Sequence, residues 1–147
     1  MATGRIVVGI DGSPASLEAL AWAATQAERM GATLDAVTAW QWPTGYGWPL
    51  PFPEGFDPAA DAERALETAL APVRDAHPVL ELRSHVVEGH PAEVLVDASR
   101  GATLLVVGNR GHGAFAGMVL GSVSEHCAAH AHCPVVVTRH PHGESEG

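Results

Sequence analysis

Lysine is missing from this chain of 147 residues, because all eight basic side chains are arginines. The absence excludes a phosphate-binding loop built on a lysine and a lysine Schiff base. Phosphate binding here must rely on backbone N–H groups, hydroxyls, arginine or a metal ion. Positive charge is scarce overall, since the formal net charge is −9. At that charge we do not expect a broad nucleic-acid-binding surface.

Cysteine and long apolar runs are scarce as well. The two cysteines, Cys127 and Cys133, are too few for a disulfide scaffold. The first residues form no apolar signal region, and no apolar run approaches the roughly 18 residues of a membrane-spanning helix. We therefore expect reduced thiols in a cytoplasmic protein that binds neither nucleic acid nor a membrane.

The sequence does contain a regular alternation of apolar and amphipathic segments. We predict strands at residues 5–10, 33–39, 81–87, 103–107 and 134–138. We predict helices at residues 14–30, from 58 to the region of Pro72, 91–98 and 122–131. This alternation predicts an α/β fold in which right-handed crossovers build a parallel sheet with helices on both faces.

Two strand orders, 3-2-1-4-5 and 2-1-3-4-5, are common for such a sheet. Loops that contain glycine follow the first and fourth strands, from Asp11 and from Gly108. Ligands of open α/β sheets bind where the chain reverses direction between neighbouring strands, so the two loops favour the order 3-2-1-4-5. We expect one domain over residues 1–140 and a flexible C-terminal tail over residues 141–147.

Three local signals bound the helices. Ser13-Pro14 and Asp57-Pro58 each combine an N-cap residue with a proline at the first helical position. Gly31 is the expected C′ residue of the first helix, and Pro72 should kink or end the second. The inward face of the first helix is expected at Leu17, Leu20, Ala21, Ala24 and Ala27.

Residues 40–53 are rich in tryptophan, proline and glycine, which excludes regular structure there. A long connection of this kind is typical of a loop that covers apolar surface, a ligand lid or a dimer contact. The residues leave these three interpretations open.

The stretch from Ala102 to Val123 runs from an apolar strand through glycines to a helix start. Such a segment can direct backbone N–H groups and a helix dipole at an anion, so we predict that it holds nucleotide phosphates. The pattern G-x-G-x-x-A occurs within it at residues 111–116. That pattern follows the fourth strand instead of the first, and a dinucleotide-binding fold is therefore not expected.

A longer spacing is also present: Gly108, two residues, Gly111, nine residues, then Gly121-Ser122. With this spacing the chain resembles the universal stress protein family, in its ATP-binding branch. The resemblance includes the opening at residues 7–13, Gly89-His90-Pro91, and the closing segment at residues 133–137.

The resemblance implies an adenine nucleotide, ATP or a relative of it, bound with Mg²⁺. Asp11 would lie near the ribose and phosphates or help to hold the metal ion, and Ile10 and Ala39 would flank the adenine. The ribose and phosphates would be enclosed by Gly108, Gly111, His112 and Gly113. The phosphates would be held at the helix start by Gly121, Ser122 and Val123.

Several of these residues can also have a simpler structural role. Asp11 can be a turn residue, Ser122 can be only an N-cap, and Arg110 can reach the phosphates or point into solvent. The histidines and cysteines of residues 126–133 do not have a standard zinc spacing, so structural or surface roles are favoured over a metal site.

Three functions remain open at this point. The leading one is an ATP-binding regulator with little or no turnover, because the sequence contains no evident pair of a nucleophile and a general base. The resemblance adds a role in stress response and a homodimer through the last strand, Pro134 to Thr138. The alternatives are a slow Mg²⁺-dependent ATPase and a dimeric interaction module that binds no nucleotide.

Overall fold

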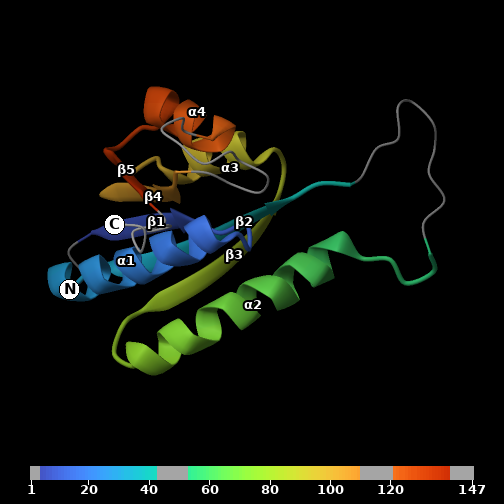
Figure 1. Cartoon of the computed structure of the whole chain (residues 1–147), viewed down its shortest axis with the longest axis horizontal. Coiled ribbons are helices and arrows are strands. Elements are labelled where there is room, and N and C mark those ends of the chain that lie inside the picture. Colours follow the sequence, from blue (N-terminus) through green and yellow to red (C-terminus); the bar gives the residue numbers. More distant parts are fainter. Residues whose placement is uncertain (1–3, 43–52, 110–120, 140–147) are drawn as a thin grey trace, which may run out of the picture.

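A computed structural model describes residues 4–42, 53–109 and 121–139, and it shows a sheet between two layers of helices (Figure 1). The strands are β1 (Arg5–Gly9), β2 (Thr33–Trp40), β3 (Leu82–Glu88), β4 (Leu104–Gly108) and β5 (Val135–Thr138). The helices are α1 (Pro14–Met30), α2 (Pro58–Ala76), α3 (Pro91–Ala98) and α4 (Ser122–His130). The predicted tail and most of the loop over residues 40–53 lie outside the described residues.

The strand order is β3-β2-β1-β4-β5 and every neighbouring pair is parallel, which confirms the predicted topology. In the register, Val7 of β1 lies opposite Asp35 of β2 and Leu105 of β4. The chain leaves β1 toward β2 and leaves β4 toward β5. The C-terminal ends of β1 and β4 therefore form the point where the connections diverge.

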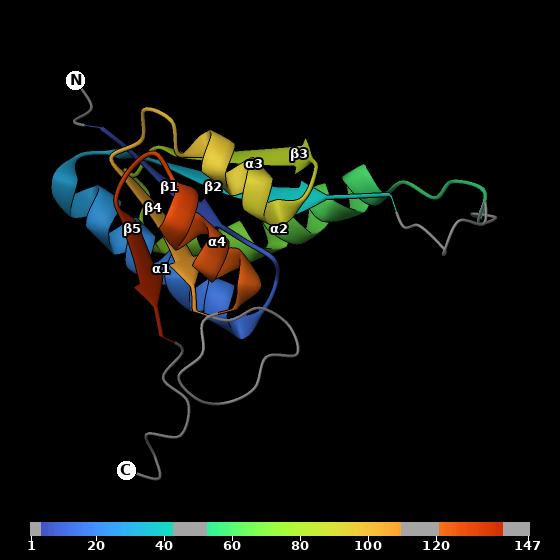
Figure 2. The same cartoon turned by 90° about the horizontal axis from the view of Figure 1, so that it is seen from above.

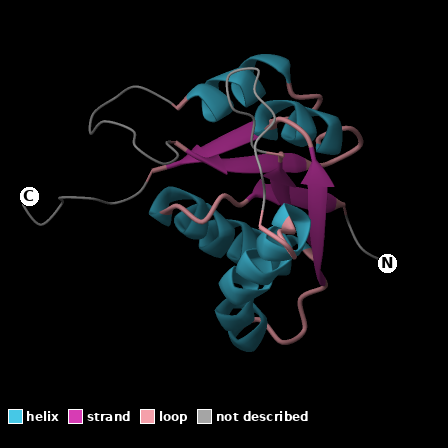
Figure 3. Ribbon diagram, turned by 90° about the vertical axis from the view of Figure 1, so that its right-hand side faces the viewer, coloured by secondary structure: helices cyan, strands magenta, loops and turns pink. Residues whose placement is uncertain are grey.

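Helices cover both faces of the sheet, as predicted (Figures 2 and 3). On one face α1 and α2 bury Leu20 and Leu66, and on the other face α3 and α4 bury Leu95 and Cys127. Residues 6–8 of β1 contribute alternately to the two core clusters and are fully buried. A central strand covered on both faces reads as one continuous apolar run, which is what the sequence shows here.

The helix boundaries follow the predicted signals. Ser13 caps α1 by accepting a hydrogen bond from the Ser16 N–H at 3.2 Å, and Asp57 caps α2 by accepting from the Ala60 N–H at 3.1 Å. Gly31 ends α1 with φ of +66°. A left-handed residue at this position is readily supplied by glycine.

The predicted inward face of α1 was wrong in detail. Leu17 and Ala21 were expected inside, but both are exposed; α1 buries a stripe of small side chains at Ala15, Ser16, Ala19, Ala23 and Ala27, together with Leu20 and Ala24. Small residues let the helix axis lie close to the sheet, and Leu17 lies outside this buried stripe.

Pro72 does not end α2, which continues to Ala76. Proline removes one N–H and so leaves the carbonyl of Thr68 without its helical donor. Both residues are exposed, so water can hydrate that carbonyl. Beyond Pro72 the Arg74 guanidinium donates to the Leu82 carbonyl at 3.1 Å and ties the last turn to β3.

Candidate functional site

The candidate site lies where the C-terminal ends of β1 and β4 meet the starts of α1 and α4. Helix α1 starts three residues after Asp11, and α4 starts 14 residues after β4 ends. Two helix N-termini therefore face the same end of two neighbouring strands. Their partial positive charges favour an anion at this position.

Asp11 forms a tight turn between β1 and α1. Its carboxylate accepts hydrogen bonds from the Ser13 N–H at 2.9 Å and from the Ser13 hydroxyl at 2.5 Å. Its own N–H donates to the Ser16 hydroxyl at 3.2 Å. The turn role of Asp11 is thus observed, while the side chain stays exposed at the edge of the site. A role toward a nucleotide stays a prediction.

Gly108 brings β4 into direct contact with the start of α1. A Cβ atom at this position would lie 2.8 Å from the backbone carbonyl carbon and oxygen of Ala15 and from its Cβ. A Cβ atom does not come within 3 Å of other heavy atoms in real proteins, so this close contact requires glycine at position 108. The close approach sets the position of the α1 N-terminus relative to β4.

The start of α4 is tied to the end of β4 by two hydrogen bonds. The Gly121 N–H donates to the Asn109 carbonyl at 2.6 Å, and the Ser124 hydroxyl donates to the Gly108 carbonyl. Gly121 is the N-cap, and Ser122 is the first helical residue, so the N-cap interpretation of Ser122 was wrong. No side chain caps α4 in the part of the chain that is described. Its first N–H groups suit an anionic ligand.

Asn109 adds a buried acceptor beneath this helix start. The residue is 8% exposed, and its Oδ1 atom has no hydrogen-bond partner in the structure described here. A buried polar atom without a partner costs free energy, and such atoms are rare in folded proteins. Asn109 therefore marks the end of β4 as a place where polar contacts are incomplete.

Ile10 and Ala39 lie at the same end of the sheet but belong to opposite faces. Ile10 is buried against the α1–α2 core cluster, whereas Ala39 packs against the cluster under α3 and α4. The Ile10 N–H donates to the Val37 carbonyl at 2.9 Å, and the Thr38 hydroxyl donates to the Ile10 carbonyl at 3.0 Å. The backbone of Ile10 is thus bonded to the strand that carries Ala39, while the side chains of Ile10 and Ala39 lie on opposite faces of the sheet.

The other predicted site residues divide into two groups. Gly108, Gly121, Ser122 and Val123 are described, and they lie together at the junction of β4 and α4. Four predicted residues lie outside the described part of the chain: Arg110, Gly111, His112 and Gly113.

The described residues do not supply a preformed set of protein ligands for the metal ion that Asp11 is predicted to hold. No group of three or more metal-binding side chains occurs among residues 4–42, 53–109 and 121–139. Cys127 is buried and Cys133 is half-buried; burial raises the pKa of the Cys127 thiol to about 11 and also raises the pKa of Cys133. The rings of His126 and His130 pack together with centroids 4.5 Å apart.

Sequence reasoning missed several residues that shape the site. Ala15, Ser16, Ser124 and Asn109 contact the turn residues or the two glycines named above. A signal existed for Ser124, because a second serine follows Ser122 in the first turn of α4. Ala15 gave none, since a close contact between distant backbones depends on how α1 packs.

The sequence model described as "Universal stress protein family" matches residues 3–139. Universal stress protein Rv2623 of Mycobacterium tuberculosis is 39% identical over 140 residues, which cover 91% of this chain. A universal stress protein of Mycolicibacterium smegmatis is 36% identical over 135 residues, again 91% of this chain. The chain spans 44% and 45% of these two relatives, less than half of their length.

Solved structures share the whole architecture. A universal stress protein in complex with cAMP is 30% identical, has a TM-score of 0.70, and is matched over 95% of this chain and 98% of its own. A universal stress protein of Archaeoglobus fulgidus in complex with dAMP is 23% identical, with a TM-score of 0.68 and coverages of 93% and 98%. Among the described helices of this chain, none is long and apolar enough to cross a membrane.

Proposed function

Because the chain belongs to the universal stress protein family, we propose that it binds an adenine nucleotide, ATP with Mg²⁺, between the ends of β1 and β4. The single observation that carries the proposal is the start of α4, which no described side chain caps and which lies beside the α1 start, at the point where the strand connections diverge. A relative that matches nearly the full chain was solved with cAMP. The relative supports an adenine nucleotide as the class of ligand.

In this proposal the phosphates lie against α4. The N–H groups of Ser122 and Val123 and the hydroxyl of Ser122 would donate to phosphate oxygens. Ser124 keeps the helix start in place through its bond to Gly108. The chain has no lysine, so backbone and hydroxyl donors, with Arg110 and the loop residues Gly111, His112 and Gly113, would supply the remaining contacts.

Asp11 is the residue proposed to hold Mg²⁺. The ion is usually bound by one or two carboxylates together with phosphate oxygens and waters, so a single carboxylate at the edge of a phosphate site fits it. The ion would neutralise phosphate charge when bound. Ser13 fixes the orientation of the Asp11 carboxylate by the two hydrogen bonds described above.

The proposed role is that of a nucleotide-dependent regulator in stress response, acting in the cytoplasm. Neither a lysine nor an evident nucleophile with its base stands at the described part of the site, and this favours binding over turnover. Family membership supports the stress-related role.

A homodimer through β5 is part of the proposal. β5 pairs with β4 alone among the described strands, so its outer backbone edge is open. An open strand edge readily pairs with another strand. The related mycobacterial chains are more than twice as long as the matched segment, which is compatible with two such units acting together.

Calorimetry and ligand extraction test the nucleotide proposal. Purified protein is denatured, any released ligand is identified by mass spectrometry, and refolded or ligand-free protein is titrated with ATP, AMP and cAMP, with and without Mg²⁺. We expect saturable binding of ATP with Mg²⁺ at one site per chain and no release of inorganic phosphate. If no adenine nucleotide is released and none of the titrations gives heat, the proposal is wrong.

Paired variants locate the metal contact. Asp11→Asn should weaken ATP binding at least tenfold in the presence of Mg²⁺ and much less in its absence. Asp75→Asn, which removes the same charge from the exposed end of α2, should leave both affinities within twofold. If Asp11→Asn lowers ATP affinity equally with and without Mg²⁺, Asp11 acts only in the turn and does not hold the metal ion.

A further inference from the structure

Trp22 is a large side chain of α1 that the rest of the described chain covers only in part. It is 37% exposed, and none of the ring pairs among residues 4–42, 53–109 and 121–139 includes it. Tryptophan is enriched where proteins contact each other, especially at the residues that carry most of the binding energy. The position of Trp22 on the helix indicates which contact it serves.

Trp22 stands on the flank of α1 that faces away from α2. Glu28 marks the other flank, because its Oε1 lies 2.6 Å from Nδ1 of His77 at the end of α2. Successive helical residues are rotated by about 100°, so Leu17 lies within about 20° of Glu28, whereas Trp22 is rotated by about 120°. The buried stripe of α1 occupies the third side, toward the sheet.

The open edge of β5 lies on the same flank as Trp22. In the strand order β3-β2-β1-β4-β5, α2 packs on β2 and β3, whereas α1 packs chiefly on β1 and β4 and reaches β5 (Figure 2). All four residues of β5, Val135–Thr138, are only partly buried, and Val136 packs against the core cluster that contains α1. An open backbone edge, half-buried valines and Trp22 therefore lie along one border of the molecule.

We propose that Trp22 anchors the interface with a second copy of this chain, beside the β5 edge. The inference rests on the dimer of the proposed function and adds a side-chain contact to it. Two copies that pair through β5 about a two-fold axis perpendicular to the sheet place their α1 helices on the same face, with the Trp22 flanks turned toward each other.

The charges beside Trp22 fit a second copy. Glu18 stands four residues before Trp22 and Arg29 seven residues after it, and both are exposed. Both lie within about 40° of Trp22 around the helix. The two-fold axis makes the neighbouring helices antiparallel, so Glu18 of one copy would lie toward Arg29 of the other. A partner that carries charge of one sign would meet a repulsive residue on this flank.

Light scattering coupled to size exclusion, over a dilution series, tests the contact. Trp22→Ala should raise the dimer dissociation constant by about tenfold or more, because a buried tryptophan carries a large share of binding energy. Leu17→Ala is the matched control, since Leu17 is 42% exposed on the flank that faces α2. It should leave the dissociation constant within about twofold, and circular dichroism verifies that both variants keep their helix content.

Exchange of the two charges tests the antiparallel arrangement. Glu18→Arg and Arg29→Glu should each weaken the dimer, and the double variant should restore it, because opposite charges then face each other again. A double variant as weak as the single ones would contradict this arrangement. A dimer that Trp22→Ala leaves unchanged, or that Leu17→Ala weakens equally, would overturn the role of Trp22 alone. An unmodified chain that is monomeric at every concentration would overturn the β5 dimer as well, and neither result alters the calorimetric test of nucleotide binding.

Discussion

At the residue scale, small side chains allow the close backbone contacts that shape the candidate site. Gly108 lets β4 touch Ala15, and the alanine stripe of α1 lets the helix lie on the sheet. Serine hydroxyls then fix the two turns, from Ser13 and Ser16 on one side and from Ser124 on the other. The site is therefore sensitive to added volume more than to lost contacts.

The first prediction concerns Gly108→Ala. The added methyl group would meet backbone atoms of Ala15 that cannot rotate away, and α1 would have to move from β4. We expect the free energy of unfolding to fall by about 1–3 kcal/mol and nucleotide affinity to fall with it. Urea unfolding measures the stability change. Gly9→Ala is the control, because its methyl group meets the flexible end of Leu95, and it should cost less.

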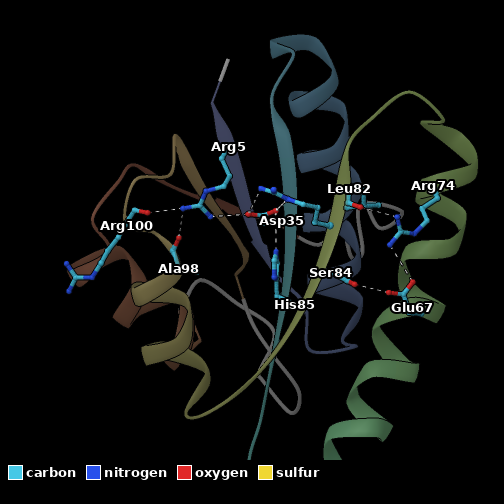
Figure 4. Close-up of polar contacts among 10 residues, drawn as sticks. Arg5, Asp35, Glu67, Arg74, Leu82, Ser84, His85, Ala98 and Arg100 are labelled. Carbon is cyan, nitrogen blue, oxygen red and sulfur yellow. Dashed lines mark hydrogen bonds and ion pairs between the residues drawn. The ribbon is translucent and has the colours of Figure 1, made fainter. Parts of the chain in front are cut away.

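The second prediction concerns the buried ion-pair cluster of Asp35. Replacing Asp35 with asparagine leaves Arg5 and Arg83 without their shared carboxylate (Figure 4); because both arginines are partly exposed to water, the free energy of unfolding at pH 7 should fall by about 1–2 kcal/mol. Burial acts to raise the pKa of Asp35, but its bonds to Arg83, Arg5 and His85 lower the folded pKa below its ordinary value of 3.8. The contribution of Asp35 is therefore complete above that value and disappears as the pH falls through and below it.

Acid titration of stability measures this dependence. The unmodified chain should lose stability between about pH 4 and pH 2, and Asp35→Asn should lose less over the same interval. Asp75→Asn, at an exposed position, should follow the unmodified chain. Parallel curves for the unmodified chain and Asp35→Asn would contradict the ionised, paired state of Asp35.

At the element scale, α2 shows how tertiary contacts override a local signal. Pro72 would end an isolated helix, yet four further residues remain helical because Arg74 bonds to β3 and the disrupted carbonyl faces water. Pro58 is different, since it stands at the first helical position, where no N–H partner is needed.

The third prediction compares these two prolines. Pro72→Ala restores a helical N–H and should raise the free energy of unfolding by about 1–3 kcal/mol. Pro58→Ala should change it by less than about 1 kcal/mol, chiefly through the unfolded chain. Thermal and urea unfolding report both values. A destabilised Pro72→Ala would mean that the proline favours a helix shape that α2 needs for packing.

At the scale of the whole molecule, the topology could be predicted, because apolar runs alternate with capped helices and glycine loops follow strands 1 and 4. The strand pairing order then placed Asp11 near Gly108 and Ser122. The rotation of α1 and the contact with Ala15 could not be predicted, because both depend on the packing of small side chains.

The fourth prediction concerns the proposed dimer through β5. The carbonyls of Pro134 and Thr138 accept from the N–H groups of Leu105 and Asn109. In a parallel strand the backbone groups of alternate residues face opposite sides, so the N–H of Val137 points to the open edge. Val137→Pro removes that donor and should convert the dimer to a monomer while β4 and β5 stay paired.

Light scattering coupled to size exclusion measures the mass of each form. The unmodified chain should have twice the mass of one chain. Val137→Ala loses side-chain contact with the core cluster but keeps the N–H, so it should remain dimeric even if less stable. A dimer that survives Val137→Pro must use another surface, and a monomeric unmodified chain would remove β5 from the proposal, leaving the nucleotide site to be judged by calorimetry alone.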